Sequence, residues 1–88
     1  MKLVFSVQAW KVYQHWVETN DKVKERINDL IRQCKRTPFK GTGKPEPLKG
    51  DLTGWWSRRN SREDRMVYRI SGSPPNQSLE IAQLRFHY

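Results

Sequence analysis

The sequence is short of several residue types, and each shortage excludes a class of protein. Cys34 is the only cysteine among the 88 residues, so no internal disulfide can form, which suits a reducing cytoplasm. No stretch approaches the roughly 18 apolar residues of a membrane-spanning helix. The apolar stretch near the start is also far shorter than the roughly 7–15 residues of a signal peptide. Two distant histidines, His15 and His87, give no zinc-ligand spacing with that cysteine. We therefore expect one cytoplasmic domain over residues 1–88, without a metal, a cofactor or a membrane segment.

Acidic residues are also scarce, and the excess of positive charge is unevenly distributed. The chain has 17 Lys and Arg against nine Asp and Glu, a formal charge of +8. Residues 36–62 hold seven cations and two anions, a net charge of +5, whereas residues 63–88 are neutral overall. A concentrated positive field attracts polyanions such as nucleic acid. A basic surface that serves solubility, or one that meets an acidic partner protein, remains an alternative.

Periodic apolar residues predict two helices in the first part of the chain. In the first, which Ser6 can cap, the apolar positions are Val7, Trp10, Tyr13 and Val17. In the second, which Asn20-Asp21 precedes and Pro38 ends, they are Val23, Ile27, Leu30, Ile31 and Cys34. We expect Trp10, Trp16 and Cys34 to lie in the core.

The remaining apolar runs predict a sheet. Leu3-Val4-Phe5 is typical of a short buried strand, and residues 39–50 hold too many glycines and prolines for a regular element. Three further strands are predicted at Leu52–Arg59, Arg65–Ile70 and Leu79–Phe86. The fold class is therefore α+β, with two N-terminal helices packed on one face of an antiparallel sheet, which leaves the other face or its edge free for function.

Trp55 and Trp56 lie next to each other in a predicted strand, so their side chains must point to opposite faces. We expect one ring to be buried. The other could serve as a stacking surface for a base, or could be exposed without a role in binding.

Two titratable residues stand out as candidates for proton transfer. Glu46 lies between Pro45 and Pro47 in the most basic part of the chain, and the two prolines stiffen the segment that carries it. A lone glutamate in such a segment is commonly a salt-bridge partner only. His87 follows the last predicted strand, on the same side as Arg85, where a purely structural histidine has little reason to be.

Cleavage of RNA without a metal needs these residue types. A base takes the proton of the ribose 2′-hydroxyl, an acid protonates the leaving 5′-oxygen, and cations stabilise the charge on the phosphorane-like transition state. A carboxylate and an imidazole can carry out the two proton transfers near neutral pH. Arginine suits the phosphate because its charge is permanent and its donors form a fork.

Six sequence blocks resemble the YoeB (Txe) toxins of the RelE-like superfamily, from bacterial type II toxin–antitoxin systems. The blocks are Lys2-Leu3-Val4-Phe5-Ser6, Arg36-Thr37-Pro38-Phe39, Gly43-Lys44-Pro45-Glu46-Pro47-Leu48-Lys49, Trp56-Ser57-Arg58-Arg59, Arg65-Met66-Val67-Tyr68 and Phe86-His87-Tyr88. The resemblance implies a RelE-like, microbial ribonuclease-like fold with a twisted sheet. It also implies an mRNA endonuclease that acts in the ribosomal A site, inhibits translation and leaves a 2′,3′-cyclic or 3′-phosphate and a 5′-hydroxyl.

The resemblance also implies a role for each site residue. Glu46 is expected to be the general base, His87 the general acid, Arg65 the main phosphate-stabilising cation and Tyr88 a residue that orients the site. The expected contacts to RNA phosphate come from four cations: Lys44, Lys49, Arg58 and Arg59.

The expected partners are mRNA, the 16S and 23S rRNA of the ribosome, a YefM-like antitoxin, and a second copy of the chain in a homodimer. Operator DNA is expected to be bound only through the antitoxin complex, which represses its own operon. Two alternatives remain: a non-cleaving RelE-fold protein, such as a gyrase-poisoning relative, and a general RNA-binding module. The turn at Ser71–Ser78 is longer than is usual in the family, and it is expected to lie away from the catalytic residues.

Overall fold

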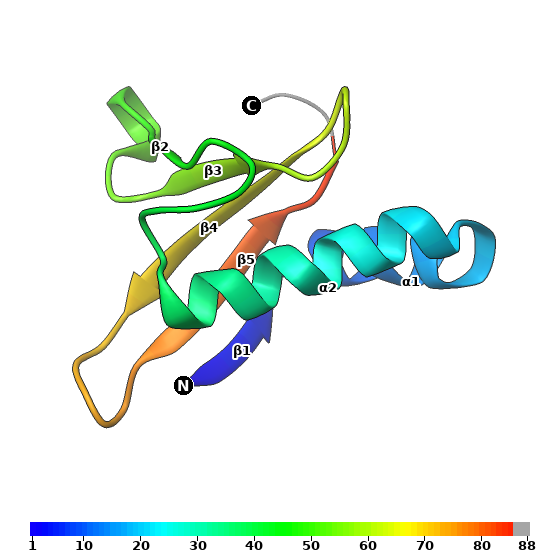
Figure 1. Cartoon of the computed structure of the whole chain (residues 1–88). Coiled ribbons are helices and arrows are strands. Elements are labelled where there is room, and N and C mark those ends of the chain that lie inside the picture. Colours follow the sequence, from blue (N-terminus) through cyan, green and yellow to red (C-terminus); the bar gives the residue numbers. More distant parts are fainter. Residues whose placement is uncertain (86–88) are drawn as a thin grey trace.

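The computed structural model describes residues 1–85 and shows two helices packed on a five-stranded sheet (Figure 1). The elements are β1 (Lys2–Phe5), α1 (Val7–Thr19), α2 (Asp21–Arg36), β2 (Glu46–Pro47), the 3₁₀ helix η1 (Gly50–Leu52), β3 (Trp56–Arg59), β4 (Arg65–Ser71) and β5 (Ser78–Gln83). The predicted α+β class, with both helices ahead of the main part of the sheet, is confirmed.

The strands lie in the order β1-β5-β4-β3-β2. The pairs β2–β3, β3–β4 and β4–β5 are antiparallel. β1 runs parallel to β5, with Phe5 opposite Ile81. The sheet is therefore mixed, which corrects the expectation of an antiparallel sheet. Parallel strands need a long crossover connection, and nearly the whole chain lies between these two. Local sequence patterns do not specify the direction of such a distant pair.

Capping residues set the ends of the two helices, as predicted. The Ser6 hydroxyl accepts a hydrogen bond from the Ala9 amide at 3.0 Å and so caps α1. The Asn20 side chain accepts from the Val23 amide at 3.2 Å and caps α2, while the Asn20 amide donates to the last turn of α1. Within residues 1–85, neither helix has both the length and the apolar character needed to cross a membrane.

The core lies between α2 and the central strands, as the apolar stripe of the second helix predicted. The buried residues of this layer are Ile27, Leu30, Ile31 and Cys34 from α2, and Met66, Tyr68, Leu79 and Ile81 from β4 and β5. Burying one such aliphatic side chain stabilises the fold by about 1.5–3 kcal/mol. Cys34 is fully buried, as expected, and its burial raises the pKa of the thiol to about 11.

The first helix meets the core through a face that matches the predicted one only in part, since Tyr13 packs against the core but other predicted positions do not. Ala9 is fully buried, whereas Trp10 is 47% exposed and Val7 is 72% exposed. Trp16 is half-buried and packs against the core. The expectation that Trp10 is a core residue is therefore wrong. Two apolar stripes lie side by side on α1. The stripe that contains Ala9 faces the core, because this small side chain lets the helix approach the sheet.

Several strand predictions also need correction. β1 is an exposed edge strand rather than a buried one, since Val4 is 45% exposed and, among the described strands, β5 alone pairs with it. Residues 39–50 do contain regular structure, because β2 pairs with β3 and η1 begins at Gly50. β3 begins at Trp56 rather than at Leu52, and β5 ends at Gln83. Phe86, at the end of the last predicted strand, lies outside the described residues.

Candidate active site

Strand alternation gives the sheet two chemically different faces. On β3 and β4, the residues that turn toward the helices are Trp56, Arg58, Met66 and Tyr68. Between them, and therefore on the opposite face, lie Ser57, Arg59, Arg65 and Val67. The face opposite the helices thus carries two arginines side by side, in cross-strand register.

Glu46 lies on the same face as these arginines. In β2 it is directly opposite Ser57, and Pro47 is opposite Trp56. Directly paired residues of neighbouring antiparallel strands share a face. Both prolines of this segment can be accommodated because β2 is an edge strand, where an amide donor can be missing. The carboxylate is exposed to solvent.

A buried serine links the glutamate strand to the arginines. Ser57 is fully buried, and its hydroxyl accepts a hydrogen bond from Arg65 Nη1 at 3.2 Å. Arg65 is half-buried, and its cross-strand partner Arg59 is exposed. Since neighbouring strands lie about 4.8 Å apart, Glu46, Ser57, Arg59 and Arg65 form one compact group, which we call the open-face site.

Two lysines lie beside the open-face site along the chain. Lys44 precedes Glu46 by two residues and has a positive φ of 51°, and Lys49 directly precedes η1. Both side chains are exposed. The segment that carries the carboxylate is therefore basic, and Arg59 and Arg65 lie on the same face of the sheet as Glu46. Such a field favours a bound polyanion.

Arg58 has a different environment from the one expected. Its side chain is fully buried on the helix-covered face, and it donates to Gln33, Thr37, Lys40, Thr42 and Tyr68. Arg58 therefore does not take the phosphate-binding role expected from the sequence, because its donors are occupied and its side chain is enclosed. Arg59, the next residue in β3, points to the opposite face and is exposed.

The two tryptophans do point to opposite faces, but neither ring is fully buried or fully free. Trp56 packs on the core and against Phe39, with ring centroids 4.6 Å apart. Trp55 lies under the Arg69 guanidinium, which is 4.4 Å from the ring centroid. Both are half-buried. The expected division into one buried ring and one free stacking surface is therefore wrong.

Sequence reasoning missed two polar residues that organise this region. Ser57, described above, holds the Arg65 guanidinium. Asn60 is fully buried, and its Nδ2 donates to the Leu84 carbonyl at 2.8 Å, which ties the β3–β4 turn to the chain after β5. The alternation that follows from Trp56 would have identified Ser57, but no local signal identifies Asn60. Within residues 1–85, no group of three or more His, Cys, Asp and Glu side chains could hold a metal ion.

The C-terminal candidates, His87 and Tyr88, lie outside the described residues. The long turn at Ser71–Ser78 follows the end of β4, whereas Arg65 begins that strand. The turn thus projects from the end of the sheet away from the open-face site (Figure 1), which agrees with the expectation.

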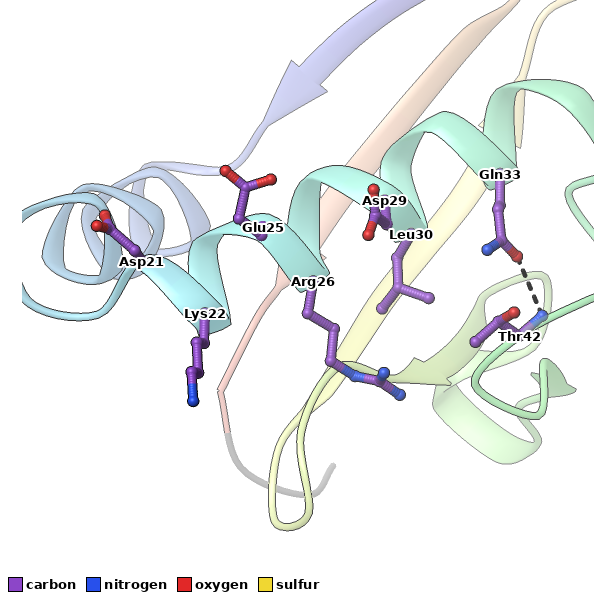
Figure 2. Close-up of a pocket in the computed structure, with 8 residues that line it drawn as sticks. All are labelled: Asp21, Lys22, Glu25, Arg26, Asp29, Leu30, Gln33 and Thr42. Atoms are coloured by element: carbon purple, nitrogen blue, oxygen red, sulfur yellow. Dashed lines mark hydrogen bonds between the residues drawn. The ribbon is translucent and has the colours of Figure 1, made fainter.

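A groove of about 540 Å³ runs along α2 on the helix-covered side, and Figure 2 shows the residues that line it. The lining residues are Asp21, Lys22, Glu25, Arg26, Asp29, Leu30, Gln33 and Thr42. None of the site residues predicted from the sequence is among them. At one end of the groove the Gln33 side chain meets the Thr42 amide, whose hydrogen bond is 3.0 Å long.

Comparisons with known proteins identify a family and a shared fold. The family model described as "YoeB-like toxin of bacterial type II toxin-antitoxin system" matches residues 5–88. The curated Toxin YoeB of Streptomyces coelicolor is 50% identical over 88 residues, which cover both chains completely. A solved YoeB/ParE toxin from Agrobacterium tumefaciens is 58% identical, with a TM-score of 0.95 and complete coverage of both chains.

Two structures from Staphylococcus aureus are also similar. One is a YoeB dimer, with 35% identity and a TM-score of 0.89. The other is a heterotetrameric complex of a YoeB-YefM toxin–antitoxin pair, with 36% identity and a TM-score of 0.88. Each alignment covers 100% of this chain and 98% of the solved chain.

Proposed function

Because the chain belongs to the YoeB-like toxins of bacterial type II toxin–antitoxin systems, we propose that it is a ribosome-dependent endoribonuclease that cuts mRNA in the A site. One observation carries the proposal: the sheet register brings Glu46, Arg59 and Arg65 to the same helix-free face. A pure binding surface needs the cations but has no use for a carboxylate among them, since it would repel the phosphates.

The proposed chemistry is a transesterification that uses no metal. Glu46 takes the proton from the ribose 2′-hydroxyl, and the 2′-oxygen attacks the adjacent phosphorus. The bond from phosphorus to the 5′-oxygen breaks, and an acid protonates that oxygen. The products are a 2′,3′-cyclic phosphate, which can open to a 3′-phosphate, and a 5′-hydroxyl. Acid–base groups held in position accelerate such a step by roughly 10²–10⁴-fold.

The surrounding residues divide the remaining work. Arg65, held by Ser57, faces the phosphate as the charge on it grows, and Arg59 and Lys49 add electrostatic support. Lys44 contacts the RNA backbone farther out. His87 is the general acid and Tyr88 orients the site; these two roles rest on the family resemblance, because both residues lie outside the described residues.

We propose partners of the same kinds as those seen in the Staphylococcus aureus structures: a YefM-like antitoxin and a second copy of the chain. The toxin would act in the cytoplasm on translating ribosomes, in contact with 16S and 23S rRNA. Operator DNA would be bound only by the complex with the antitoxin.

The proposal can be tested by adding the purified protein to ribosomes that are programmed with a defined message and measuring cleavage of that message. Primer extension should show cuts at codon positions in the A site, and a single 2′-deoxy substitution at the cut site should abolish them. Undiminished cleavage of the deoxy message would contradict the mechanism. RNA binding without any cut, or inhibition of gyrase instead, would support one of the two alternative functions.

A further inference from the structure

The fully buried Arg58 donates most of its hydrogen bonds to a single loop. Its five N–H donors meet five acceptors, as a guanidinium requires when it is enclosed. Nε donates to the Tyr68 hydroxyl at 3.2 Å, and Nη1 donates to Gln33 Oε1 and to the Thr42 carbonyl, both at 3.4 Å. Nη2 donates to the carbonyls of Thr37 at 2.5 Å and Lys40 at 2.6 Å. Three of the five acceptors are therefore backbone groups of residues 37–42.

Two side chains next to Arg58 also form hydrogen bonds to the same loop. The Tyr68 hydroxyl donates to the Pro38 carbonyl at 2.5 Å. Gln33 Oε1 accepts from the Thr42 amide at 3.0 Å, the bond drawn in Figure 2. We call Gln33, Arg58 and Tyr68 the loop hub. Among the ion pairs of residues 1–85, none involves Arg58, so carbonyl dipoles of the loop compensate its charge.

The loop leads directly from the hub to the candidate base. The Gly43 carbonyl accepts from the Arg59 amide at 2.8 Å. Gly43 has a φ of +88°, and a Cβ atom there would lie 2.9 Å from the Arg59 carbonyl oxygen, so a side chain does not fit. Only Lys44 and Pro45 separate this contact from Glu46. The loop is thus fixed against β3 just before it becomes β2.

β2 alone cannot hold the carboxylate firmly. It has two residues and, within residues 1–85, pairs with β3 alone. Beyond it, the Leu48 amide donates to the Trp55 carbonyl at 2.9 Å, which fixes the far side of the segment. A strand of this length adds few contacts of its own. The position of Glu46 therefore depends on the loop before it as well as on the Leu48 contact after it.

We propose that Arg58 and Gln33 are positioning residues that fix Glu46 through the loop hub, although they touch no substrate. This inference rests on the proposed function, because it assigns Glu46 the proton transfer. Opening the loop would leave a buried cation without acceptors, so the hub favours one closed arrangement. Weakening it displaces the base while Arg59 and Arg65 stay on the sheet. The expected defect is therefore in the chemical step rather than in RNA binding.

Single-turnover cleavage on programmed ribosomes separates these two effects. Arg58→Lys keeps the charge but loses the fork, and Gln33→Met leaves the cation in place but removes the acceptor of the Thr42 amide. We expect the rate at saturating toxin to fall roughly 10- to 100-fold in Arg58→Lys, and less in Gln33→Met, because small misplacements of reacting groups are costly. The half-saturating concentration should stay within about twofold. Arg32→Met, which removes an exposed arginine of α2, should match the wild type.

Amide hydrogen exchange supplies a readout that does not depend on activity. In both hub variants the Thr42 amide should lose protection, while the amides of α2 and β4 keep theirs. A raised half-saturating concentration with an unchanged maximal rate would overturn the proposal, since it would indicate a phosphate contact. So would an unchanged rate in a variant whose Thr42 amide has lost protection.

Failure of the proposed function has a separate signature. If the wild-type chain does not cut RNA at all, the proposed function fails. The role of the loop hub in holding the loop is then tested by amide hydrogen exchange alone. Loss of Thr42 protection in both variants then supports the positioning of the loop, and retained protection overturns it.

Discussion

Arg58 and Arg59 are neighbours in the sequence, yet they have opposite environments. Arg58 faces the helices, is fully buried and binds backbone carbonyls. Arg59 faces the other way, is exposed, and lies opposite Arg65. The residue type is the same, so the face of the strand alone decides the role. Under the helices a guanidinium organises the protein's own loop, and on the open face it remains available for a phosphate.

The same division applies to the sheet as a whole. The helix-covered face carries the apolar core and the loop hub, and the open face carries Glu46, Arg59 and Arg65. Stability should therefore depend mainly on the covered face. The groups that act directly on RNA should lie on the open face, and the loop hub should affect activity only through the position of Glu46. The following changes test that division.

Glu46→Gln should have the largest effect, and it should affect activity alone. The amide keeps the size of the side chain but cannot accept the 2′-hydroxyl proton, so the cleavage rate should fall roughly 10²–10⁴-fold. Since the side chain is exposed, the free energy of unfolding should change by no more than about 0.5 kcal/mol. Single-turnover cleavage and urea unfolding measure the two quantities. A large loss of stability, or cleavage at the wild-type rate, would contradict the division of roles between the two faces of the sheet.

Tyr68→Phe should have the largest effect on stability. The hydroxyl donates to Pro38 and accepts from Arg58, and without it both groups are left unsatisfied in a buried place. The expected cost is about 2 kcal/mol in the free energy of unfolding, from urea denaturation. Tyr13→Phe is the matched control, because its hydroxyl donates to Asn28 Oδ1 at 2.8 Å in a half-buried site on the helices. Equal losses in the two variants would argue against a special role for the hub.

Alkaline pH should weaken the covered face selectively. Burial raises the pKa of Cys34 from 9.0 to about 11 and that of Tyr68 from 10.0 to about 12. Because both folded pKa values are raised, the unfolded chain loses these protons first, and the fold is destabilised as the pH rises above about 9. The urea midpoint should therefore fall between pH 9 and 11, and Cys34→Ala should move the start of that fall upward by about one pH unit. A midpoint that stays constant over this range would contradict the assignment.

The resemblance and the periodicity together predicted much of this molecule, and the misses have physical causes. The stripe of α2 and the caps at Ser6 and Asn20 are local features, so the sequence predicts them well. The face of α1 was missed because two apolar stripes overlap on it, and β2 was missed because its pairing with β3 is a long-range contact within a Gly- and Pro-rich segment. The burial of Arg58 was missed because the sequence does not show which of Trp55 and Trp56 faces the helices, and alternation places Arg58 on the same face as Trp56.

Glu80→Gln should have the smallest effect, and it tests whether the open face outside the site matters for stability. Glu80 accepts hydrogen bonds from Ser71 Oγ at 2.6 Å and Arg69 Nε at 2.8 Å, which lower the pKa of its carboxyl group. Because the folded pKa is the lower one, the stabilisation is present at neutral pH and is lost as the pH falls through it. The variant should be less stable by about 0.5 kcal/mol at pH 7, the size typical of a partly exposed ion pair, and cleavage should be unchanged. As the pH falls through the folded-state pKa, which lies below 4.5, the urea midpoints of the variant and the wild type should converge, since protonation removes the same charge from the wild type. A difference that persists in acid would mean that the neutral side chain packs differently, and that this face contributes to stability by more than charge.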